Sequence, residues 1–256
     1  MIPRPLRGRS RRRAPPRRHG ATRFPEAAGA LTTCLLALLL GAAPLARAVE
    51  ADGQLWNAIT ATGRFEEGGR SRHWLEAQAR FGEDASRLGQ TLLRAGVGFD
   101  ATRTGSLWLG YAHIHTEPAG AARNRTEHRL WQQWLWSPRR SLAGFELLAR
   151  SRLEQRRFED FDDTGWRARQ FLRLARPLDA EGHWSLVLWD ELFVHLDDTD
   201  WGADRGLDQN RAFAGLARRL GPALRLEAGY LNQYTRRDGR TDALGHTFSL
   251  AFFLTR

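Results

Sequence analysis

Charged and apolar residues alternate at every second position through much of this sequence, and this pattern restricts the fold more than any other feature. Between residues 74 and 81, Glu76, Gln78 and Arg80 alternate with leucine, alanine and phenylalanine. The same period of two runs through residues 145–156 and 167–174. Successive side chains of a strand point to opposite faces, whereas a helical pattern would repeat every 3.6 residues. These segments are therefore predicted to be strands with one charged face and one apolar face.

About eleven such segments follow one another, separated by clusters of Gly, Asp, Pro and Arg. They span residues 54–64, 72–82, 90–100, 105–115, 126–136, 142–157, 165–176, 183–195, 206–219, 223–235 and 244–254. Neighbouring segments joined by short connections pair as an antiparallel meander. The predicted fold class is all-β, an antiparallel up-and-down transmembrane β-barrel. Because bacterial single-chain barrels of the outer membrane normally have an even number of strands, we expect about 12 strands, with 10 as the alternative.

The connections between these segments alternate in length from the third segment onward. The tight connections are residues 101–105, 137–141, 177–182 and 220–222, and the longer, more polar ones are 116–125, 158–164, 197–205 and 236–243. Short turns at one rim and long loops at the other are typical of outer-membrane barrels. The tight rim, together with the C-terminus, is predicted to face the periplasm.

Alternation alone does not say which face lies inside the barrel. A soluble barrel encloses its apolar face, whereas a membrane barrel turns that face toward lipid. About eleven long strands enclose more space than apolar side chains fill, which favours the membrane barrel over a soluble periplasmic lipocalin-like binding barrel. The tryptophans near segment ends, interpreted as an interfacial girdle, are Trp56, Trp74, Trp136, Trp166 and Trp184.

In a membrane barrel the charged face lines the lumen, and here arginine is in excess. The lumen-lining candidates are Glu76, Arg80, Arg94, Glu127, Arg129, Arg150, Arg152, Glu154, Arg167, Arg169, Arg173, Glu191, Arg211, Arg225, Glu227 and Gln233. Two interpretations stay open. Arginine and glutamate could neutralise each other across strands as a structural ladder, because the guanidinium group offers several donors in a fixed fork. Alternatively, the arginines could form a basic constriction that binds or passes anions.

The first 48 residues differ from the rest and are predicted to be a secretion signal. Ten arginines and one acid precede or flank an apolar run over residues 27–40, and Ala46 and Ala48 place small residues before a cleavage site after Ala48. The predicted barrel domain is residues 49–256, which carry 29 basic and 28 acidic residues. The high isoelectric point therefore belongs to the leader, and a basic nucleic-acid-binding domain is not expected. The single cysteine, Cys34, also lies in the leader.

Several short motifs bear on the identity of the chain. They are Leu107-Trp108-Leu109-Gly110-Tyr111, residues 127–133, residues 189–194, Asp208-Gln209-Asn210-Arg211 and residues 225–233. Together they resemble the bacterial family called domain of unknown function 2490, over about residues 54–253. The resemblance implies an outer-membrane barrel without an assigned activity.

Metal-binding and catalytic interpretations have weaker support in the sequence than the charged lumen. His113 and His115 share a strand face near His128, but their spacing matches no specific ligand motif. Four aspartates in one long loop could hold calcium through oxygen ligands, although solvated acids are the simpler interpretation; they are Asp197, Asp198, Asp200 and Asp204. For a lipid hydrolase, His246 and Ser249 stand three positions apart on one strand, so they point to opposite faces.

The sequence therefore predicts an exported protein of the cell outer membrane that acts in passive transport, binding or envelope structure. It is not expected to be an enzyme, to bind a metal or cofactor, or to bind nucleic acid. The alternatives are an outer-membrane lipid-modifying hydrolase and the soluble periplasmic binder. The expected partners are outer-membrane lipid, the barrel-assembly machinery during biogenesis and small anionic solutes.

Overall fold

A computed structural model describes residues 49–120, 122–139, 141–237, 239 and 241–256; the predicted leader, residues 1–48, lies outside the described residues. The described chain forms strands joined by turns. They are β1 (Val49–Arg64), β2 (Ser71–Gly82), β3 (Arg87–Asp100), β4 (Gly105–Thr116), β5 (Arg125–Trp136), β6 (Glu146–Phe158), β7 (Thr164–Pro177), β8 (Trp184–His195), β9 (Gly206–Arg219), β10 (Leu224–Thr235) and β11 (Asp242–Thr255). No helix in this part of the chain is long and apolar enough to cross a membrane.

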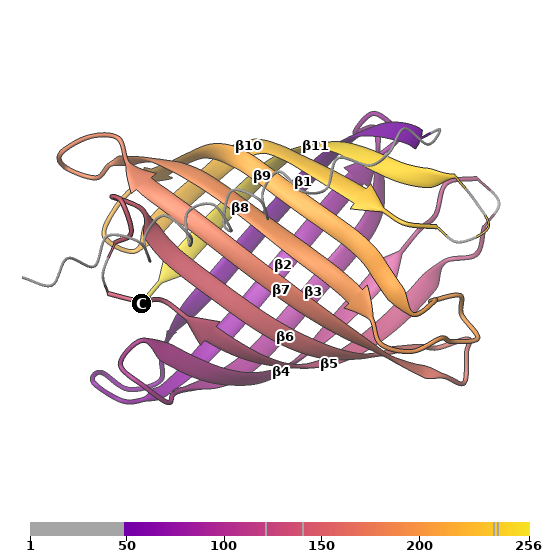
Figure 1. Ribbon diagram of the computed structural model, residues 1–256, viewed down its shortest axis with the longest axis horizontal. Helices are drawn as coiled ribbons and strands as arrows, with labels where there is room; N and C mark the ends of the chain where they lie inside the picture. Colours follow the sequence, from indigo (N-terminus) through magenta and orange to yellow (C-terminus); the bar gives the residue numbers. More distant parts are fainter. Residues whose placement is uncertain (1–48, 121, 140, 238, 240) are drawn as a thin grey trace, which may run out of the picture. The chain divides into compact units, whose positions relative to one another are not determined.

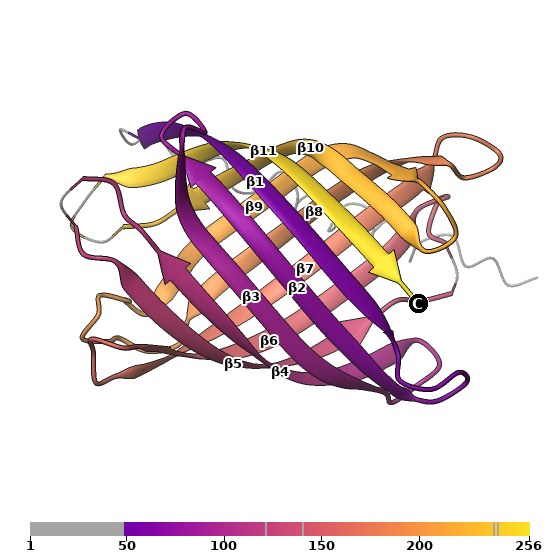
Figure 2. The same cartoon turned by 180° about the vertical axis from the view of Figure 1, so that it is seen from behind.

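The strands close into one barrel in which each pairs with its sequence neighbours, as Figures 1 and 2 show from two sides. Ten of the pairings are antiparallel, and β1 closes the barrel by pairing in parallel with β11, with Val49 opposite Asp242 and Thr62 opposite Thr255. The all-β fold class is confirmed. The counts of 12 and 10 and the purely antiparallel topology were wrong, because a meander of eleven strands returns to its first strand in the same direction.

Each rim of the barrel carries five connections. The N-rim, where β1 begins, carries the β2–β3, β4–β5, β6–β7, β8–β9 and β10–β11 connections, and the C-rim, where β11 ends, carries the β1–β2, β3–β4, β5–β6, β7–β8 and β9–β10 connections. The longest connection, residues 196–205, lies on the N-rim, but the predicted division into a tight rim and a long-loop rim holds only in part, since 178–183 on the C-rim is longer than 159–163 on the N-rim. The connection at 137–145 is longer than expected, because Leu142 and Phe145 form a small bridge of their own before β6 begins.

Aromatic side chains and glycines fill one arc of the barrel interior. Trp131 is fully buried, and a Cβ atom on Gly110 would lie 2.2 Å from its ring. A Cβ atom on Gly96 would lie 2.5 Å from the same ring, so both glycines are needed for this close approach. Trp74 packs edge-on against Trp131 and Trp108. This arc, from β2 to β5, is a packed wall.

The tryptophans interpreted as an interfacial girdle divide between the two faces. Trp136, Trp166 and Trp184 are exposed, whereas Trp56 and Trp74 line the interior cavity. The interpretation was therefore wrong for Trp56 and Trp74. Position near a strand end does not decide which way a side chain points; Trp56 and Trp74 alternate in phase with the inward-facing positions of their strands.

Candidate functional site

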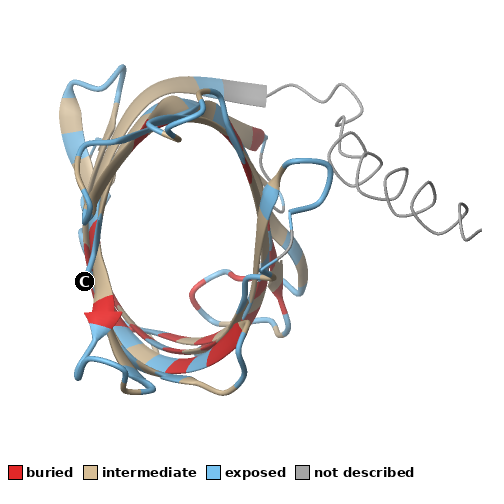
Figure 3. Ribbon diagram, turned by 90° about the vertical axis from the view of Figure 1, so that its left-hand side faces the viewer, coloured by how far each residue is buried: buried red, intermediate tan, exposed pale blue. Residues whose placement is uncertain are grey.

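The barrel encloses a cavity of about 890 Å³ whose lining comes from all eleven strands. Figure 3 looks along the barrel from the end that carries the C-terminus. Twelve arginines and four glutamates line the cavity. The inner face therefore carries a marked excess of positive charge, and this cavity is the candidate site.

Most of the residues predicted to line the lumen do line this cavity. The exceptions are Arg152 and Glu154, which are almost completely buried in the wall of β6. The prediction missed Arg72, Arg125 and Arg156, which also line the cavity. Arg156 continues the alternation of β6 and could have been found from that pattern, whereas Arg72 and Arg125 lie near strand ends where the pattern is short.

A buried ion-pair network joins three neighbouring strands. The Oε2 atom of Glu154 on β6 lies 2.7 Å from Nη2 of Arg167 on β7, and its Oε1 atom lies 2.6 Å from Nη1 of Arg169. Arg169 also contacts Glu191 on β8 at 2.8 Å. Arg150 of β6 reaches the same carboxylate at 2.6 Å. These contacts form the predicted kind of structural ladder, in which each glutamate forms ion pairs with two arginines.

Two further ion pairs pass over intervening strands inside the barrel. Arg167 on β7 contacts Asp208 on β9 at 2.8 Å, and Arg173 on β7 contacts Glu227 on β10 at 2.6 Å. Strand β8 lies between the first two partners, and strands β8 and β9 lie between the second two. The paired side chains therefore extend through the interior of the barrel and narrow it. Asp208 was not among the predicted site residues, although it belongs to the Asp208–Arg211 motif.

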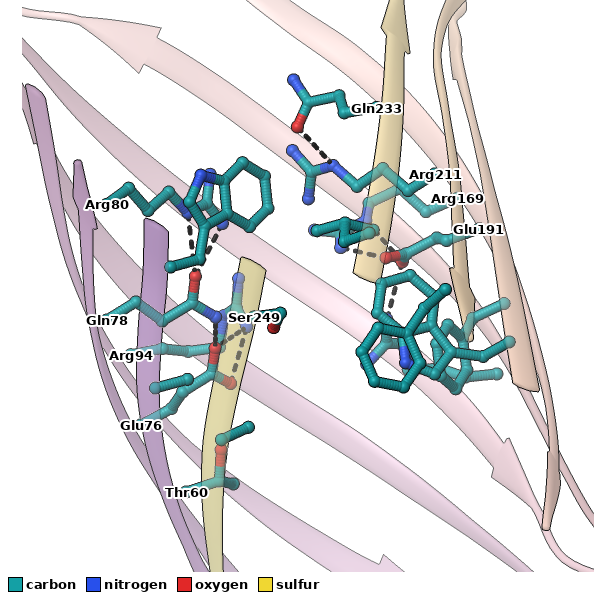
Figure 4. Close-up of a pocket in the computed structure, with 18 of the residues that line it drawn as sticks. Thr60, Glu76, Gln78, Arg80, Arg94, Arg169, Glu191, Arg211, Gln233 and Ser249 are labelled. Carbon is teal, nitrogen blue, oxygen red and sulfur yellow. Dashed lines mark hydrogen bonds and ion pairs between the residues drawn. The ribbon is translucent and has the colours of Figure 1, made fainter. Parts of the chain in front are cut away.

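The remaining arginines of the inner face either form an ion pair with a nearby glutamate or have no carboxylate partner among the described residues. Arg94 pairs with Glu76 at 2.8 Å. Glu127 accepts from Arg129 at 2.6 Å and from Arg156 at 2.5 Å. Two inward-facing arginines, Arg80 and Arg211, form no ion pair with a carboxylate among the described residues. Figure 4 shows both of them projecting into the cavity from different sides.

The histidines considered as metal ligands lie on the outer surface. The rings of His113 and His128 are 5.7 Å apart between centroids, and His128 also contacts Tyr111 and Glu159 through its two ring nitrogens. These neighbours are an ordinary surface hydrogen-bonding arrangement. They form no metal-binding cluster in the described part of the chain.

The acidic loop between β8 and β9 uses its carboxylates to hold backbone amides. Asp197 accepts a hydrogen bond from the backbone N–H of Trp166, and Asp198 accepts one from that of Arg205, at 2.8 Å and 2.6 Å. Asp200 accepts one from the backbone of Asp162 at 3.0 Å. These contacts organise the loop, so these carboxylates have a structural role.

One acidic and histidine cluster was not predicted from the sequence. Asp179, Glu181 and His183 lie together in the turn after β7, with candidate ligand atoms within 4.8 Å of one another. Slight burial raises the pKa of Asp179, but hydrogen bonds from the backbone N–H groups of Trp184 and His183 lower it further, and the net pKa lies below its usual range. The carboxylate therefore closes the turn.

Comparison with known proteins agrees with the motif resemblance. The family model described as "protein of unknown function (DUF2490)" matches residues 53–244. An uncharacterized protein of Methylorubrum extorquens is 39% identical over 223 residues, which cover 86% of this chain and 94% of that protein.

Proposed function

The chain belongs to the family described as protein of unknown function (DUF2490), and we propose that it is an outer-membrane β-barrel whose lumen binds or passes small anionic solutes. One observation supports this proposal above the others. The charged faces of the strands line the interior, while large apolar side chains lie exposed outside. A soluble barrel would have the opposite arrangement, because exposing a continuous apolar surface to water is unfavourable.

The outer face supports a membrane location in detail. Exposed apolar residues around the barrel include Ile59, Leu75, Leu93, Val97, Phe99, Leu107, Leu109, Leu130, Leu192, Leu216, Phe248 and Leu254. Toward the N-rim, outward positions also hold polar residues, such as His113, His128 and Asn232. The strands are 12 to 16 residues long, more than the roughly 9–11 that a tilted strand needs to span a bilayer. We infer that the C-rim half is embedded and the N-rim projects outward.

The composition of the lumen supports anions as the solutes. Twelve arginines face four glutamates in the cavity lining, and guanidinium groups bind carboxylates and phosphates through two parallel hydrogen bonds. A positive interior also concentrates anions from solution. Catalysis is not part of the proposal: Ser249 lines the cavity, while His246 contacts Tyr230 on the outer surface, so the two side chains do not cooperate.

Two measurements test the proposal. Membrane fractionation and electrophoresis before and after heating are expected to show an outer-membrane protein whose migration changes on heating. Ion currents across a planar bilayer under a salt gradient are expected to show anion preference, reduced by Arg150→Ala or Arg169→Ala. A soluble periplasmic protein would contradict the membrane location. Currents that prefer cations, or that keep the same anion preference in both variants, would contradict the role of the arginines.

A further inference from the structure

Arg80 is held by two glutamines rather than by an acid. Its Nε and Nη2 atoms donate to Oε1 of Gln78 at 3.1 Å and 2.6 Å, and its Nη1 atom donates to Oε1 of Gln90 at 2.7 Å. Each glutamine is oriented by a second contact, since Gln78 donates to Glu76 and Gln90 donates to Thr116. The guanidinium group is therefore fixed in place while its positive charge is not neutralised.

Arg211 repeats this arrangement from a distant part of the sequence. Its Nε atom donates to Oε1 of Gln233 at 3.1 Å, and its Nη2 atom donates to Oε1 of Gln209 at 3.0 Å. Gln233 is oriented in turn by donating to Thr235 at 3.2 Å. The Nη1 atom of Arg211 makes no hydrogen bond within the described residues and is a free donor toward the lumen.

Trp56 brings these two cations together. The central carbon of the Arg80 guanidinium lies 4.1 Å from the centre of the Trp56 ring, and that of Arg211 lies 4.9 Å from it. The two guanidinium groups are thus no farther apart than the sum of these distances. Both arginines and Trp56 line the same cavity and are only partly buried, so solutes in the lumen can reach them.

Arg80 and Arg211 are exceptions among the arginines of the lumen, because most of the others have a carboxylate partner. Among the other cavity-lining arginines, only Arg125 also has no described carboxylate within 4.0 Å, and it is exposed at the N-rim over Phe158 and Phe161. Two like charges held near each other in a narrow interior repel, and desolvation increases the cost. A structural ladder would have placed acids beside them, as it does for Arg94 and Arg169.

We propose that Arg80 and Arg211 form a binding site for a small divalent oxyanion inside the lumen. One dianion would neutralise both charges, and the free guanidinium N–H donors would hold its oxygen atoms. Phosphate, sulfate and a short dicarboxylate share this chemistry. The glutamines act as positioning residues, because their amides fix the forks without competing for the anion. This site rests on the proposed lumen function, but binding to it requires no conduction.

The test is anion binding by the full barrel refolded in detergent, measured by calorimetry with inorganic phosphate, sulfate, succinate and acetate as separate probes. At least one of the three dianions is expected to bind with one site per barrel and more tightly than acetate. Arg80→Gln and Arg211→Gln are each expected to weaken this binding at least about tenfold, as expected for loss of hydrogen bonds to a charged group. The same anion is expected to raise the melting temperature of the wild-type barrel and of neither variant.

Arg125→Gln is the matched control, since it removes one positive charge from the same cavity without touching Trp56 or the glutamines. Arg80→Lys keeps the charge but not the fork, and it is expected to fold and to bind more weakly than wild type. The site is wrong if no dianion binds more tightly than acetate, or if Arg125→Gln weakens binding as much as Arg80→Gln. Binding without any bilayer current would leave this site standing and contradict only the transport part of the proposed function.

Discussion

At the scale of single residues, Glu154 lies within 4.0 Å of more arginines than any other acid that the structure describes. It is fully buried and pairs with Arg167 and Arg169, while Arg152 lies 3.8 Å away. Its carboxylate offsets a cluster of positive charge that water does not reach. A buried charge that loses its partner is strongly destabilising, so this position is a structural requirement as well as part of the wall.

Replacing Glu154 with glutamine is expected to lower the free energy of unfolding by about 3 kcal/mol, the lower end of the range for a broken buried pair. The lower end applies because Arg167 keeps Asp208 and Arg169 keeps Glu191. Guanidinium chloride unfolding of the detergent-refolded barrel measures this value. Glu181→Gln, in the exposed turn after β7, is the control and should be near neutral. Equal stability of the two variants would show that the network does not stabilise the fold.

At the scale of elements, the seam between β1 and β11 distinguishes this barrel from an even-stranded one. The two strands run in the same direction through fourteen paired positions, and their inner faces both contribute to the cavity. One consequence is that β1 begins at one rim and β11 ends at the other. The termini of the barrel therefore lie on opposite sides of any membrane that it spans.

Cysteines placed at register partners test the parallel seam. Ala58 and Ala251 are paired and both face the cavity, so the double variant Ala58→Cys, Ala251→Cys is expected to form a disulfide on mild oxidation. The product should migrate as a compact band on heated, non-reducing gels. The pair Ala58→Cys, Thr247→Cys, four positions out of register, should remain reduced. Efficient cross-linking of the second pair in place of the first would contradict the register.

At the scale of the whole molecule, the exposed apolar side chains of the outer face form an apolar belt, and its position sets how the proposed outer-membrane barrel would sit in a bilayer. On β4, Leu107 and Leu109 are exposed in the half nearer the C-rim, while His113 and His115 occupy outward positions nearer the N-rim. The belt is thus displaced toward the C-rim. The strand length beyond the belt would project from the membrane on the side with the longest loop.

Arginine substitutions along this one strand measure the depth of insertion. Leu109→Arg is expected to destabilise the barrel folded into lipid bilayers by about 2–4 kcal/mol, because the charge would lie on the lipid face. His113→Arg, two outward positions closer to the N-rim, is expected to cost about 0–1 kcal/mol. Denaturant unfolding from lipid vesicles provides both values. Equal and small effects would show that this face meets water, and the membrane location would be wrong.

The sequence by itself determined the strands and their two faces, because side-chain alternation is a local property of extended backbone. Three of the residues that the alternation assigns to the charged face, Glu76, Arg169 and Glu191, line the cavity of the structure. Closure was decided only by the tertiary structure: eleven segments can be counted, but whether β1 meets β11 in parallel depends on all the strands together. The same holds for Arg173 and Glu227, which pair across intervening strands, and for Arg80 and Arg211, which meet at Trp56. Strand register and tilt bring these residues together, and both accumulate around the whole barrel.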